Sequence, residues 1–199
     1  MNACKLLLAV VMVALVLGSL VASTSARNIS SSSQTTRSTF TNVEFVGSGG
    51  TTTRCAVTLE ASLHARTFAK VANALVGYVT GASVGGCAAT ILTATLPWHI
   101  RYTAFFGFLP RITSIRTAVI GFAMQIAEPV FAPCLMTSTA EEPLVQIYKR
   151  ETATEVLTAN EVGGIIRTRN CLEASTRFVG ITNSFTVVEA ATRITVRLI

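Results

Sequence analysis

The sequence contains no aspartate, and histidine occurs only twice, as His64 and His99. A serine–histidine triad needs a carboxylate that orients its histidine, so only glutamate could fill that role here. Both histidines fall on the polar face of an expected strand, and neither has a second histidine two positions further on. They could meet across a sheet and bind a metal with a glutamate, but solvent-facing histidines are commoner. We therefore predict no catalytic triad, no metal site and no cofactor.

One short pattern does resemble a catalytic motif. Residues 81–85 read Gly-Ala-Ser-Val-Gly and match G-x-S-x-G, in which a strand–turn–helix lifts the serine hydroxyl towards a histidine. Here a run rich in β-branched residues continues to Thr95 where the motif requires a helix. The pattern around Ser83 is therefore typical of a strand end or a turn.

Long apolar runs are also scarce, and the only one lies at the N-terminus. It extends from Leu6 to Leu17, with Lys5 before it and small residues after it up to Ala26. A positive start, a short apolar run and small residues are the layout of a secretory signal peptide. The alternative, an uncleaved anchor over residues 6–22, falls short of the about 20 apolar residues that a spanning helix needs. We predict a signal peptide over residues 1–26, secretion, and no transmembrane segment in the processed chain.

The charge is moderately positive. Loss of Lys5 with the signal peptide would lower the formal net charge from +6 by one. Such a charge favours acidic surfaces or polymers as partners. The basic residues are scattered, however, and the densest group is Lys149-Arg150 followed by Arg167 and Arg169. That spacing fits solvated strand faces, so we predict no specific binding of nucleic acid.

Four cysteines remain after the signal peptide: Cys55, Cys87, Cys134 and Cys171. An even number in an exported chain predicts two disulfides, with three possible pairings. Zinc would need closely spaced cysteine pairs, whereas these cysteines are roughly 30 to 50 residues apart.

Symmetry favours one pairing. If residues 56–67 and 75–84 form an antiparallel hairpin, Cys55 and Cys87 come to lie opposite each other. The same symmetry about residues 152–153 brings Cys134 opposite Cys171. We therefore predict the bridges 55–87 and 134–171.

The first part of the processed chain, residues 27–54, is rich in serine, threonine and glycine. Such a stretch buries too little apolar area to offset the entropy lost on ordering. We predict a flexible leader in which only Phe40 to Val46 fits a short strand.

From Cys55 onward, apolar residues recur at every second position, which is typical of strands with one buried face. Four runs place these residues inward: Val57, Leu59, Ala61, Leu63 and Ala65; Leu96, Trp98, Ile100 and Tyr102; Ala118, Ile120, Phe122, Met124 and Ile126; and Ile194, Val196 and Leu198. About eight to ten strands predict one all-β, mainly antiparallel domain over residues 55–199, either a β-sandwich or a barrel. Residues 68–78 fit a strand or a short amphipathic helix, and the sequence leaves that choice open.

The most distinctive segment is Leu96 to Tyr102. Trp98 and Tyr102 could form a stacking platform for a sugar, with His99 and Arg101 as hydrogen-bonding partners. Alternation instead places both aromatic residues on the apolar face, which favours a core role. These four residues are the candidate ligand-binding residues of the sequence.

Several segments resemble a group of uncharacterised exported actinobacterial proteins. They are residues 63–67 (LHART), 77–80 (GYVT), 93–102 (TATLPWHIRY) and 192–199 (TRITVRLI). The resemblance implies secretion and a β-rich fold; it brings no known activity and therefore no site residues. We expect a secreted, non-enzymatic protein with a binding or structural role. The first alternative is an extracellular pocket protein for an apolar or carbohydrate ligand, and the second is a hydrolase.

Overall fold

The structure, a computed structural model, describes residues 28–47, 52–107, 112–127, 133–150, 157–169, 175–181, 188–189, 192–193 and 196–198. The predicted signal peptide lies outside these ranges. Within them every regular element is a strand, apart from one 3-10 turn, η1 (Thr93–Thr95). The described part of the chain has no helical segment with the length and hydropathy needed to cross a bilayer. The prediction of a mainly antiparallel all-β protein is confirmed.

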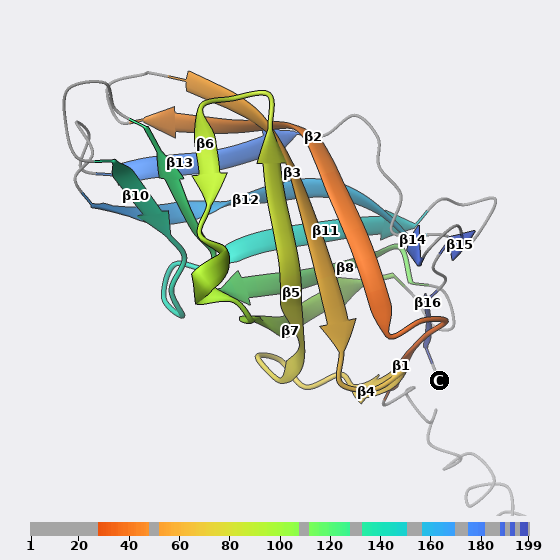
Figure 1. Cartoon of the computed structure of the whole chain (residues 1–199). Helices are drawn as coiled ribbons and strands as arrows, with labels where there is room; N and C mark the ends of the chain where they lie inside the picture. The colour runs from red at the N-terminus through yellow and green to blue at the C-terminus, as the bar shows by residue number, and fades with distance from the viewer. Residues whose placement is uncertain are drawn as a thin grey trace, which may run out of the picture.

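Eight of the described strands form an antiparallel barrel around a common interior (Figure 1). They are β2 (Thr35–Gly47), β3 (Thr52–Leu63), β5 (Leu75–Gly85), β7 (Trp98–Phe106), β8 (Ser114–Ile120), β11 (Leu144–Arg150), β12 (Leu157–Arg169) and β13 (Ser175–Ile181). Each pairs with the next in this order, and β13 also pairs with β2, which closes the ring. Of the two expected architectures, the chain adopts the barrel.

Shorter strands extend this barrel at two places. From β12 the ladder continues through β10 (Cys134–Thr137) and β9 (Ala123–Ile126) to β6 (Ala89–Ile91). On the other side, β14 (Val188–Glu189) pairs with β2 and with β15 (Thr192–Arg193).

A separate three-stranded sheet lies at one end of the barrel, near the ends of β2 and β3 (Figure 1). It contains β16 (Val196–Leu198), β1 (Asn28–Ser31) and β4 (Thr67–Ala69), with β1 in the middle. Ile29 of β1 is fully buried in the core. This sheet, called the end sheet below, therefore packs its central strand against the barrel interior.

The end sheet and β2 correct the prediction of a flexible leader. Residues 28–47 form β1 and β2, and β2 is a full strand of the barrel that pairs with β3 and β13. Phe40, Val43 and Phe45 of β2 are buried. The apolar area that these residues bury offsets the entropy lost on ordering. The composition of this stretch had suggested that too little apolar area would be buried.

The predicted hairpin and its disulfide are confirmed. Strands β3 and β5 are antiparallel, and Cys55 is bonded to Cys87 with their Cα atoms 5.2 Å apart. Residues 68–78, where helix and strand were both open, contain the end of β4, a turn and the start of β5. Cys134 is also disulfide-bonded. Its predicted partner, Cys171, lies outside the described residues.

The alternation predicted for residues 118–126 is only partly confirmed in its first half, where Ala118 is buried as expected. Val119 is fully buried and Ile120 only partly, the reverse of the expected pattern. The chain then leaves β8 at Gly121, whose φ of 93° is open to glycine and costly for other residues. Strand β9 begins after this break with a new phase, and Phe122 and Met124 are buried as expected.

Candidate functional site

The structure separates the four candidate residues of the segment 96–102 into two pairs. Trp98 and Tyr102 are buried, with 1% and 3% of their surface exposed, whereas His99 is exposed and Arg101 half-buried on the other face of β7. Because side chains of a strand alternate between its faces, the two pairs cannot form one site. Trp98 donates a hydrogen bond from Nε1 to Thr95 Oγ1 (2.8 Å), which anchors it in the core.

The residues considered for metal binding and catalysis also remain apart. His64 and His99 lie on either side of Tyr78, with ring-centroid distances of 4.9 and 5.4 Å to the tyrosine. The described residues contain no group of three or more His, Cys, Asp or Glu side chains that could hold a metal ion. Ser83 is exposed near the end of β5, where it pairs with Thr58, and no helix follows, so it does not occupy the strand–turn–helix that its motif requires.

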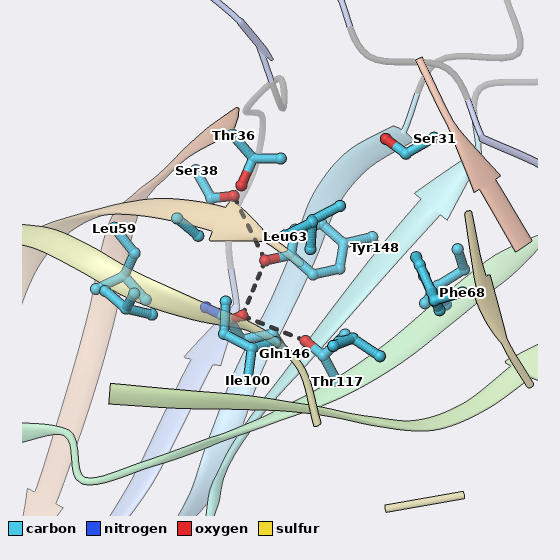
Figure 2. A pocket seen from close by; sticks show the side chains of 14 residues that line it. Ser31, Thr36, Ser38, Leu59, Leu63, Phe68, Ile100, Thr117, Gln146 and Tyr148 are labelled. Carbon is cyan, nitrogen blue, oxygen red and sulfur yellow. Dashed lines mark hydrogen bonds between the residues drawn. The ribbon is translucent and has the colours of Figure 1, made fainter. Parts of the chain in front are cut away.

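A cavity of about 80 Å³ lies at the end of the barrel that the end sheet covers. Barrel strands form most of its wall, and β1 and β4 contribute Ser31 and Phe68. Figure 2 shows the lining residues: Ser31, Thr36, Ser38, Leu59, Ala61, Leu63, Phe68, Val76, Val79, Ile100, Ile115, Thr117, Gln146 and Tyr148. This site, called the barrel cavity below, is mainly apolar, as small-molecule pockets generally are.

A row of polar side chains crosses the barrel cavity (Figure 2). Ser38 Oγ donates to the Tyr148 hydroxyl (3.4 Å), and that hydroxyl donates to Gln146 Oε1 (2.8 Å). Thr117 Oγ1 donates to the same amide oxygen (3.3 Å). The row joins residues of β2, β8 and β11, and every bond runs between side chains.

One end of this row is unsatisfied. The amide nitrogen of Gln146 is buried and has no hydrogen-bond partner in the described structure, although the residue is only 2% exposed. A buried donor without a partner costs about 1–3 kcal/mol. Such a group is rare in folded proteins and calls for an occupant that accepts a hydrogen bond.

The electrostatic environment favours neutral groups. The lining residues of the barrel cavity include no carboxylate, amine, guanidinium or imidazole. Burial raises the pKa of Tyr148 to about 12, and the hydrogen bond with Ser38 opposes this rise without cancelling it. The phenol therefore stays protonated at neutral pH and acts as a hydrogen-bond donor, not as an anion.

Sequence reasoning did not single out any residue of the polar row. Gln146 and Tyr148 are two positions apart on β11, so they share the face that also carries buried Leu144. Two polar residues on an otherwise apolar strand face were the available signal.

Comparison with protein-family models, with curated proteins and with solved structures gives no match for this chain.

Proposed function

We propose that the protein is a secreted binding protein that holds a small, mostly apolar molecule in the barrel cavity. The observation that carries this proposal is the unpaired amide nitrogen of Gln146 in a cavity whose other walls are mainly apolar. A folded chain gains nothing from a buried donor without a partner, whereas a ligand that accepts a hydrogen bond there is held both by that bond and by apolar contact.

The size of the cavity limits the ligand. An apolar protein cavity of about 150 Å³ binds benzene, and the barrel cavity has about 80 Å³. A ligand smaller than benzene therefore fits entirely, and a larger one would place one end inside. Ser31 and Phe68 bring the end sheet into the wall, so the ligand would enter past that sheet.

The lining favours binding over turnover. Its serine hydroxyls are engaged with neutral partners: Ser31 Oγ donates to the Ser33 carbonyl oxygen (2.7 Å), and Ser38 Oγ donates to Tyr148. No general base or acid with a pKa near neutrality lines the cavity. These features support a protein that carries or senses its ligand unchanged.

Secretion is supported by the cysteines and by the N-terminal sequence. The Cys55–Cys87 disulfide requires an oxidising compartment in most organisms, and residues 1–26 have the layout of a signal peptide. Expression of the full-length sequence with an affinity tag at the C-terminus, followed by N-terminal sequencing of protein from the medium, tests this part. We expect a new N-terminus near Ala26; retention of Met1 in the cell fraction would overturn it.

Binding is tested by thermal stabilisation and calorimetric titration with a panel of small hydrocarbons, ketones, alcohols, carboxylic acids and short sugars. A ligand at about 100 times its Kd should stabilise the fold by about 2.7 kcal/mol. Ala61→Leu adds three carbons to the wall of the cavity and should abolish binding. Ala140→Leu makes the same change at an exposed position outside the lining and should leave binding intact. Failure of the whole panel to bind the wild type, or unchanged binding by Ala61→Leu, would refute the proposal.

A further inference from the structure

The polar row of the barrel cavity has a direction. The hydroxyls of Tyr148 and Thr117 both donate to Gln146 Oε1, and Ser38 donates to Tyr148. The amide oxygen thus already accepts two hydrogen bonds, which is its normal capacity. The only unused polar atom of the amide is its nitrogen, which carries two hydrogens and no lone pair for acceptance.

This direction decides which ligand group fits. An acceptor is needed at Gln146 Nε2, and an alcohol could supply one only by bringing its own hydrogen into the site. Gln146 Oε1 and the Tyr148 hydroxyl oxygen already accept hydrogen bonds, so the hydrogen of the alcohol could be accepted only by the hydroxyl oxygens of Ser38 and Thr117, which serve as donors in the row. A carbonyl oxygen accepts without donating, and it therefore satisfies the amide and leaves no new unpaired group.

The absence of charged side chains in the lining restricts the class of ligand further. A carboxylate also accepts hydrogen bonds, but it would enter a mainly apolar site with no cation in its lining. Removing an unpaired charge from water costs several kcal/mol, which one amide hydrogen bond does not offset. The walls around the amide, which include Leu59 and Ile100 (Figure 2), add apolar contact only.

We infer that the barrel cavity selects an uncharged carbonyl compound, a small ketone or ester with an apolar body, whose carbonyl oxygen accepts a hydrogen bond from Gln146 Nε2. This inference rests on the proposed binding function and adds the chemical class of the ligand. It predicts discrimination within sets of molecules that have the same size and shape.

The test uses the whole processed chain and a matched series of four compounds: a methyl ketone, the corresponding secondary alcohol, the corresponding alkane and the carboxylate of equal length. Calorimetric titration should show that the ketone binds about 5 to 30 times more tightly than the alkane, the effect of one hydrogen bond to a buried donor. The alcohol should fall between them, and the carboxylate should bind at least about 10 times more weakly than the ketone.

Two variants assign the effect to the amide. Gln146→Leu keeps the approximate volume and removes the donor, so the ratio of ketone to alkane affinity should fall to about 2 or less. Thr117→Val removes a neighbouring hydroxyl and leaves Nε2 in place, so the ratio should persist. Where Gln146→Leu does not fold, the wild type still decides: the infrared carbonyl band of bound ketone should lie at lower frequency than that of the same ketone in an alkane solvent.

The outcomes separate the two proposals. Equal affinities for ketone and alkane, tighter binding of the alcohol or the carboxylate, a ketone preference that survives Gln146→Leu, or an unshifted carbonyl band would overturn the inference and leave binding in the barrel standing. If none of the four compounds nor any member of the wider panel binds, the proposed function fails and the inference falls with it.

Discussion

Removal of the Cys55–Cys87 bridge should destabilise the barrel by an amount that follows from the length of the loop it closes. The two cysteines are 32 positions apart. In the chain-entropy model a loop of that length corresponds to about 3.7 kcal/mol at 25 °C. Folded β3 and β5 are already held together by the pairing of Ala56 with Gly85 beside the bridge, so its main effect is to restrict the unfolded chain.

The variant Cys55→Ala/Cys87→Ala tests this value while the bond at Cys134 remains. Equilibrium unfolding in guanidinium chloride, followed by Trp98 fluorescence, should show a loss of about 3–4 kcal/mol and a larger m-value, because the unfolded chain expands. The Tm should fall by about 7–15 °C for a chain of this size. Ser83→Ala, an exposed change on the same hairpin, is the control and should change stability by less than about 0.5 kcal/mol.

The bridge also lies away from the barrel cavity, which uses Leu59, Ala61 and Leu63 from the later part of β3. Ligand affinity of the folded double variant should therefore stay within about twofold of the wild type. A stability loss below about 1 kcal/mol with an unchanged m-value would show that the loop is already restricted in the unfolded chain, and the reasoning above would be refuted.

Three further predictions concern single residues. Because the pKa of Tyr148 is raised to about 12, its neutral form should contribute stability fully below pH 10, and on the order of 2–3 kcal/mol should be lost as the pH rises towards 12. Tyr148→Phe should flatten this part of the pH–stability curve, and an equally steep curve in the variant would contradict the assignment. Gly164→Ala should destabilise the fold by about 2 kcal/mol or more in urea unfolding, since the φ of Gly164 is 149° and an added Cβ would lie 2.6 Å from the Pro143 carbonyl oxygen. Gly85→Ala is the control, because a Cβ added there has no neighbour within 4 Å, and it should be neutral or slightly stabilising. Trp98, which is 1% exposed and does not line the barrel cavity, should be poorly quenched by acrylamide and should keep its emission when ligand binds; a large ligand-induced change would place the ligand elsewhere.

Local patterns were sufficient for the hairpin of β3 and β5. From Cys55 every second residue of β3 is apolar, and Val57 and Leu59 are buried as the pattern predicts. The two cysteines flank the hairpin at similar distances from its turn, so one symmetry argument gave both the antiparallel pairing and the bridge.

The same local reasoning did not work for β2 because of what the interior contains. Ser38 is buried and Thr36 lines the barrel cavity, so small polar residues face inward on this strand. A composition of serine and threonine therefore resembled that of a solvated leader. These residues face the interior because β2 pairs with β3 and β13. A local sequence pattern does not contain that pairing.

The phase of β8 was ambiguous for a different reason. Apolar residues occupy both parities between Ile115 and Ile126, so alternation alone cannot select the inward set. Pairing with β7 and β11 selects Ile115 and Thr117 as the pair that lines the cavity. The polar row could not be predicted from local patterns either, because its residues come from three strands that only the closed barrel brings together.

The closing pair of the barrel has a consequence for how the protein acquires its activity. Along the ring each barrel strand neighbours the barrel strand that precedes it in the sequence, except where Val43 of β2 meets Gly180 of β13. Seven of the eight contacts thus join successive barrel strands and can form early, whereas the contact between β2 and β13 joins segments far apart in the sequence and should form slowly. Before that meeting there is no enclosed interior, so a refolding experiment should register the gain of ligand affinity and the final, slowest folding phase as a single event.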